Sequence, residues 1–240
     1  MRILKPAFVA LQVALAIALS APRASASPVG TLSVGICPGG GVTVTATSID
    51  WLLPAGGGNG CIETGTPTNV VWSGGTLVPG VQGLILDLPG SGLPLSNFMT
   101  FTGNAGLSYE LDGLGPGVAN TNCAALAIGD SCSVFAGSPF ILTLTFNPFS
   151  GFGTSVTLTA GGRVFDPTGF SLWGGSFTSQ FANLTPAQIQ ATILGNGSIT
   201  NTYSGTFVAT TRAIPEPASL ALLGVGLLGV AARARKRWLA

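Results

Sequence analysis

The chain has 240 residues, of which only 7% are charged, and it contains 36 glycines, 16 prolines and no histidine. Between Ser27 and Ile214, seven acids and two bases (Arg163 and Arg212) give a formal charge of −5. An acidic span without lysine disfavours nucleic-acid binding, and the lack of histidine excludes Ser-His-Asp and Cys-His catalysis.

The first residues have the three parts of a secretory signal peptide. Arg2 and Lys5 supply positive charge, residues 7–19 form an apolar run, and Ala24 and Ala26 complete a small-x-small cleavage pattern. An uncleaved anchor is the alternative, but the order and spacing of the parts favour cleavage after Ala26. The sequence therefore predicts that the Sec export machinery and signal peptidase act on this chain.

The body of the chain, residues 27–213, is predicted to be one extracellular all-β domain. Residues 41–49, 140–146 and 154–160 alternate apolar and hydroxyl-bearing side chains, which is typical of strands with one buried face. Further strand candidates are residues 83–88, 107–111, 162–165, 170–181 and 199–210. Many short strands between Gly-rich turns favour a β-sandwich or a jelly-roll-like fold.

One segment near the end of this domain has the pattern of a helix. Thr185 is a predicted N-cap, Pro186 stands at the first helical position, and Gln188 completes a capping box. Ile189, Ile193 and Leu194 fall on one side and Gly195 ends the segment. These signals predict a short helix at residues 186–194.

The four cysteines, Cys37, Cys61, Cys123 and Cys132, all lie in the exported part of the chain. In an oxidising compartment an even number of thiols indicates disulfides. Because short loops close most easily, we expect the pairs Cys37–Cys61 and Cys123–Cys132. A zinc site is not expected, since no Cys-x-x-Cys spacing and no histidine are present.

Two groups of residues could carry binding or catalysis. Trp51, Trp72 and Trp173 could form an exposed carbohydrate platform, although core packing is their usual role. Glu110 and Asp112 lie two apart on a predicted strand, so both side chains would project to one side. A glycosidase requires two neighbouring carboxyl groups, and this pair is the candidate for them. A polar strand end that enters a turn is the simpler interpretation of this pair.

Two further patterns lead to weaker hypotheses. Asp112, Asp130, Asn120 and Asn122 offer oxygen atoms for calcium, but their spacing matches no EF-hand loop. Rows of threonine could order water for ice binding, yet threonine is also common on the wet side of a strand. These rows are Thr43, Thr45 and Thr47; Thr143 and Thr145; and Thr157 and Thr159. We therefore predict no catalytic, cofactor or metal site.

Residues 214–240 form a tail of three parts. Pro215, Glu216 and Pro217 come first, an apolar segment at residues 218–232 follows, and a basic end at residues 233–240 closes the tail. The basic residues of this end are Arg233, Arg235, Lys236 and Arg237. The apolar segment also matches G-x-G-x-x-G. A dinucleotide site requires an acidic residue further along the chain, and none follows this segment.

This tail resembles the PEP-CTERM sorting signal of exported bacterial proteins. The resemblance implies that residues 215–217 are the recognition motif for an exosortase, a membrane-embedded processing enzyme. It also implies transient anchoring in the inner membrane by the tail, followed by attachment at the cell surface or release. Basic residues after an apolar segment favour a cytoplasmic end, which agrees with that orientation.

The sequence thus predicts three parts: a signal peptide at 1–26, the β-rich domain at 27–213 and the sorting tail at 214–240. The leading hypothesis is a non-enzymatic surface or extracellular-matrix protein with a structural or adhesive role in a biofilm. A carbohydrate-binding module or a weak glycoside-active enzyme is the alternative. Extracellular polysaccharide is a candidate partner under either hypothesis.

Overall fold

The computed structural model describes residues 27–53, 58–88 and 92–211, together with Gly224 and Gly226. Contacts divide the chain into two units, of which the larger is Ala26–Thr211. The predicted signal peptide and sorting tail, apart from the two described glycines, lie outside the described residues. No helix in the described ranges is long and apolar enough to cross a membrane.

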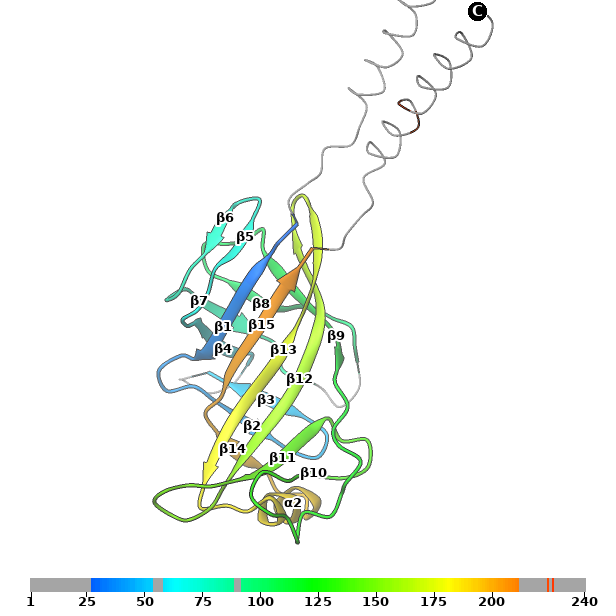
Figure 1. Cartoon of the computed structure of the whole chain (residues 1–240). Helices are drawn as coiled ribbons and strands as arrows, with labels where there is room; N and C mark the ends of the chain where they lie inside the picture. Colours follow the sequence, from blue (N-terminus) through cyan, green and yellow to red (C-terminus); the bar gives the residue numbers. More distant parts are fainter. Residues whose placement is uncertain (1–26, 54–57, 89–91, 212–223, 225, 227–240) are drawn as a thin grey trace, which may run out of the picture. The chain divides into compact units, whose positions relative to one another are not determined.

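The larger unit is built almost entirely from strands, with one short helix (Figure 1). The first nine strands are β1 (Gly30–Ile36), β2 (Gly41–Val44), β3 (Ile49–Leu52), β4 (Gly60–Thr64), β5 (Val70–Trp72), β6 (Gly75–Leu77), β7 (Gln82–Ile85), β8 (Leu95–Phe101) and β9 (Ser108–Leu114). The remaining elements are β10 (Ser131–Ser133), β11 (Phe140–Thr145), β12 (Gly153–Asp166), β13 (Gly169–Ala182), α2 (Pro186–Leu194), β14 (Ile199–Asn201) and β15 (Ser204–Thr210). The expectation of an all-β domain with one helix is therefore confirmed.

The main sheet closes on itself. Within the described residues its order is β10-β11-β12-β13-β15-β1-β4-β7-β8-β9, and β9 also pairs with β12. The length of β12 permits this closure, because residues 153–158 pair with β11 and residues 160–165 pair with β9 along the same edge. The register shifts between Gly161 and Gly162, which is the kind of irregularity that bends a strand around a closed sheet.

The half of the unit that contains β11 has two layers. A separate sheet with the order β14-β2-β3 contributes Val42, Val44, Ile49 and Trp51 to a small apolar space of about 40 Å³. Side chains of β11, β12 and β13 line the same space from the opposite side. The predicted sandwich packing thus occurs in this half only, while the rest of the main sheet forms a closed ring.

Aromatic side chains fill the interior. Trp173 meets Phe207 edge to face, with ring centroids 5.2 Å apart, and Phe177 lies 4.8 Å from both Trp51 and Phe207. These four rings are nearly or fully buried. Burying one aromatic side chain removes about 150–250 Å² from water, so this cluster holds the closed ring and the smaller sheet together.

The helix α2 begins where the capping signals predicted. The Thr185 hydroxyl accepts a hydrogen bond from the Gln188 backbone N–H, and the Gln188 side chain accepts one from the Thr185 N–H at 2.8 Å. Ile189 and Ile193 are buried as expected, but Leu194 is 55% exposed. The predicted apolar side of the helix is therefore narrower by one residue.

The predicted strand at residues 41–49 is wrong in its second half. Strand β2 ends at Val44, and a tight turn leads into β3 at Ile49. The Thr45 hydroxyl accepts hydrogen bonds from the N–H groups of Thr47 and Ser48, at 3.2 and 3.0 Å. Such local bonds compete with sheet pairing, so the alternating pattern continues past the end of the strand.

Candidate functional site

The tryptophans do not form an exposed platform. Trp51 and Trp173 are only 2% and 4% exposed, and the Trp173 indole N–H donates to the Glu110 carbonyl at 2.9 Å. Trp72 is half-buried and packs against the core. The hypothesis of a carbohydrate platform made from these three side chains is therefore wrong, since two of them are buried and the third is partly buried.

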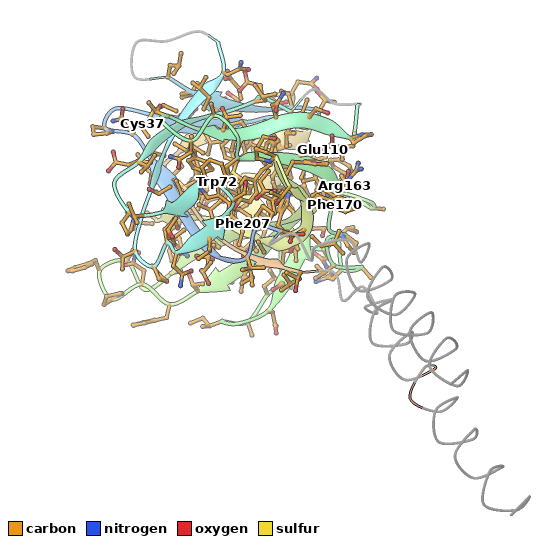
Figure 2. The ribbon with its side chains drawn as sticks, turned by 90° about the horizontal axis from the view of Figure 1, so that it is seen from above. Cys37, Trp72, Glu110, Arg163, Phe170 and Phe207 are labelled. Atoms are coloured by element: carbon orange, nitrogen blue, oxygen red, sulfur yellow. A yellow bond between two sulfur atoms is a disulfide. The ribbon has the colours of Figure 1, made fainter. Side chains whose placement is uncertain are left out.

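The carboxylates of Glu110 and Asp112 do lie together, but they meet a cation. Arg163 on β12 forms an ion pair with Glu110 and donates to Asp112 from Nε at 3.0 Å and from Nη2 at 2.9 Å. The hydrogen bond with Asp112 raises the pKa of Arg163. Glu110 also accepts a hydrogen bond from the Ser96 hydroxyl at 2.7 Å. Figure 2 shows Glu110 and Arg163 on one side of the unit, near Phe170.

The oxygen atoms suggested for calcium have donors within the protein. Asn120 Oδ1 accepts from the Asn122 N–H at 3.0 Å, and Asp130 Oδ2 accepts from the Ala127 N–H at 3.0 Å. Asp112 is bound to Arg163 as described above. Among the described residues, no group of three or more cysteine, aspartate or glutamate side chains is arranged to hold a metal ion.

Both predicted disulfides are present. Cys37 is bonded to Cys61, and Cys123 is bonded to Cys132. The sequence separations of the two pairs are 24 and 9. The second bond ties the segment before β10 to β10 itself. There the Ser133 hydroxyl accepts a hydrogen bond from the Val118 N–H at 2.8 Å.

The outer side of the main sheet gathers hydroxyl groups from six neighbouring strands. Antiparallel partners project to the same side of a sheet, so the observed register places these residues together. We call this surface the hydroxyl face. It consists of Thr31, Ser33, Ser131, Thr143, Ser155, Thr157, Thr159, Ser176, Thr178, Ser204 and Thr206.

Successive strands align these hydroxyl groups in rows. Thr206 pairs with Ser33 on one side and with Ser176 on the other, and Ser176 pairs with Thr159. The strands that carry this row, β1, β15, β13 and β12, run side by side in Figure 1. Strands lie about 4.8 Å apart, and alternate residues along a strand lie about 6.6 Å apart. The rows therefore form a two-dimensional array of hydrogen-bonding groups.

Several hydroxyl groups of the face bond to each other. Ser131 and Thr143 approach to 2.8 Å, Thr178 and Ser204 to 3.2 Å, and Ser33 and Thr206 to 3.4 Å. A hydroxyl can donate once and accept twice, so each pair retains capacity for further bonds. The defining residues include no charged side chain, and all of them are exposed or half-buried.

On the side of β11 opposite the hydroxyl face, a pocket of about 420 Å³ opens beside Phe140. It is lined by the turn at residues 45–49, by Leu88 and Leu93, by Leu114, and by residues of the loop at 135–140. Sequence reasoning missed this pocket, because its walls come from four separate segments. The available sequence signal was Phe135, an aromatic residue directly before the Ala-Gly-Ser-Pro stretch at residues 136–139.

The comparisons with known proteins concern the tail. No curated protein and no solved structure matches the chain. Residues 213–236 match the family model described as the PEP-CTERM protein-sorting motif, which confirms the resemblance seen in the sequence. Such a motif implies that the protein is exported, associated with the cell surface and processed by an exosortase-type enzyme.

Proposed function

We propose that this protein is a non-catalytic adhesive component of the bacterial cell surface or extracellular matrix. The sorting motif supports delivery by export and exosortase processing. Under this proposal, the signal peptide directs export, and the tail anchors the chain in the inner membrane until it is processed. The β-rich domain then acts outside the cell.

The observation that carries the adhesive role is the hydroxyl face. Its side chains offer donors and acceptors without charge, which suits a neutral, hydroxyl-rich polymer such as an extracellular polysaccharide. A typical hydrogen bond contributes only about 0.5–1.5 kcal/mol net, so useful affinity requires many repeated contacts along a polymer. The acidic character of residues 27–214 opposes the binding of anionic polysaccharides.

The same rows of threonine raise again the question of ice binding. A closed sheet is necessarily twisted, because its strands tilt around a common axis. Twist rotates successive rows relative to one another, and Gly35 and Ile141 interrupt the row that contains Thr157 and Thr178. A flexible polymer can follow such a surface, whereas a flat crystal plane cannot.

The sorting part of the proposal is tested by replacing Pro215, Glu216 and Pro217 with alanine in the native host. We expect an unprocessed chain that stays with the inner membrane. A variant with Thr76→Lys, at an exposed position of the β-rich domain, serves as the control for expression. If the triple variant has the same size and location as the natural protein, the sorting role of this motif is wrong.

The adhesive part is tested by co-sedimentation of the full chain in lipid nanodiscs with insoluble neutral polysaccharides. Thr206→Lys and Thr159→Lys place a charge within the hydroxyl face, and we expect each to weaken binding about tenfold. The matched control is Thr76→Lys, because Thr76 is an exposed strand residue of β6 outside this face. Equal sedimentation of all variants, or no binding of any polymer, would contradict the proposal.

A further inference from the structure

We propose that the 420 Å³ pocket is a second, concave site that binds a single uncharged sugar unit. This inference rests on the proposed function, since the sugar would belong to the same neutral polymer. The volume falls in the range of about 300–1,000 Å³ that is usual for small-molecule sites. We call this 420 Å³ pocket the sugar pocket.

The lining of the sugar pocket selects against charged ligands. None of the described residues that line it is acidic or basic. Asp50 and Asp87 each adjoin a lining residue in sequence, but neither is among the lining residues. The Asp87 carboxylate accepts a hydrogen bond from the Trp51 N–H at 2.8 Å. An anionic or cationic ligand would therefore enter the pocket without a counter-charge, which costs free energy in a partly desolvated site.

The pocket has apolar groups that suit the C–H side of a sugar ring and polar groups that suit its hydroxyl groups. Phe135 and Leu93 are 36% and 42% exposed, so they offer apolar surface for the C–H side of a pyranose. Thr47 and Ser48 line the same pocket and supply hydroxyl groups for the ring hydroxyls. The Thr47 hydroxyl forms no hydrogen bond within the described ranges. The Ser48 hydroxyl already shares a hydrogen bond with the Thr45 hydroxyl at 2.8 Å, so a purely aliphatic ligand would leave the Thr47 hydroxyl unpaired.

Both walls of the pocket are held in place before a ligand arrives. On one side, the Thr45 hydroxyl fixes the turn through Thr47 and Ser48, and the Thr45 N–H donates to the Ser48 carbonyl at 3.0 Å. Such preorganisation lowers the entropy cost of binding. The backbone that carries the Thr47 and Ser48 hydroxyl groups is therefore held in a fixed position.

On the other side, the loop that carries Phe135 is fixed from both ends. The Ser138 N–H donates to the Phe135 carbonyl at 3.0 Å. From α2, the Gln190 side chain donates to the Val134 carbonyl at 2.9 Å, and the disulfide at Cys132 lies three residues before Phe135. The helix and the second disulfide thus act as supports for the binding loop.

The experiment is saturation-transfer-difference NMR with the full chain in lipid nanodiscs. The probes are neutral methyl glycosides of glucose, galactose and mannose, with glucuronate and glucosamine as charged counterparts. We expect saturation of the ring C–H protons of at least one neutral glycoside and none for the charged sugars. Phe135→Ala should weaken that binding about tenfold, which corresponds to about 1.4 kcal/mol.

The matched control is Phe149→Ala, because Phe149 is 98% exposed and is not among the residues that line the pocket. Equal binding by Phe135→Ala and the natural chain would overturn the proposal. So would the absence of transfer to every neutral glycoside, or displacement of the glycoside by hexanol with Phe135→Ala unaffected.

The two proposals fail separately in these experiments. If Phe135→Ala and the natural chain sediment equally with a polymer and no glycoside binds, only the sugar pocket is wrong. If glycosides bind at Phe135 but the variants of Thr206 and Thr159 sediment normally, the role of the hydroxyl face is wrong.

Discussion

Gly30 on β1 pairs with Ala209 on β15, so the chain enters and leaves the larger unit on neighbouring antiparallel strands. Strand β15 lies between β1 and β13 in the closed ring and ends at Thr210. The sorting motif begins only at residue 213. Cleavage at the motif therefore removes no strand of the ring.

This relationship predicts that processing leaves the domain stable. We expect a chain that ends at Thr211 to unfold at the same temperature as the full chain, as measured by circular dichroism. A chain that ends before Ser204 lacks β15, exposes the edges of β1 and β13, and should not fold. A clear loss of stability in the first truncation would show that the tail contributes to the fold.

Arg163 should stabilise the domain through its two carboxylate partners. Replacing it with glutamine leaves Glu110 and Asp112 as neighbouring like charges, so the melting temperature should fall at low ionic strength. Because these groups are partly exposed, salt should screen the repulsion and reduce the difference. Arg163→Lys keeps the charge but not the paired hydrogen-bond geometry. Its melting temperature should lie between those of the natural chain and the glutamine variant. A glutamine variant as stable as the natural chain would contradict this role.

Asp166 should make stability depend on acidity. Burial alone would raise its pKa, but hydrogen bonds from Thr168 and Ser73 outweigh burial and lower the pKa below the usual 3.8. A carboxylate with a lowered pKa stabilises the fold above pH 3.8, and that contribution is lost as the pH falls further.

For this reason Asp166→Asn should cost about 1–3 kcal/mol at neutral pH, through the loss of charged hydrogen bonds. The difference from the natural chain should shrink below pH 3.8. Urea unfolding at a series of pH values measures both quantities. A difference that stays constant through the acid range would rule out this linkage.

The two disulfides should contribute unequally. In the chain-entropy description, a loop the size of Cys37–Cys61 is worth about 3.5 kcal/mol and one the size of Cys123–Cys132 about 2.7 kcal/mol. Replacing each pair by serine and measuring urea unfolding tests this order. The shorter bridge also supports the loop of Phe135, so its loss should weaken the sugar pocket as well. The opposite order of stabilities would contradict the entropic account.

Gly162 should be required for closure of the ring. A Cβ at this position would collide with the Glu110 carbonyl oxygen on β9, so Gly162→Ala should cost about 1–3 kcal/mol. The matched control is Gly174→Ala on β13, where a Cβ would meet no atom nearer than 3.9 Å. The control should be neutral or slightly stabilising in thermal unfolding. Similar losses in both variants would show that closeness to β9 is not the reason.

Much of the local structure could be predicted from the sequence, because its signals act over a few residues. The capping box of Thr185 and Gln188 located α2 correctly, and the alternation in residues 140–146 and 154–160 located β11 and part of β12. Loop closure favours near neighbours, which led to the correct cysteine pairs. The tail motif likewise depends only on consecutive residues.

Other features depend on which strands become neighbours, and sequence periodicity does not contain that information. Glu110 and Asp112 were correctly placed on one side of a strand, but their partner Arg163 lies more than fifty positions later. The threonine pattern was visible in separate runs, whereas the hydroxyl face exists only through the register of six strands.

The sequence by itself determined the sorting motif, the β-rich character, the helix and the disulfide pairs, since each arises from local spacing or composition. Only the tertiary structure decided that β9 closes the ring on β12, that Trp51 and Trp173 are buried, and that Phe135 and Thr47 line one pocket. These outcomes follow from non-local pairing and from burial of apolar surface. Both depend on the whole set of contacts and not on any single segment.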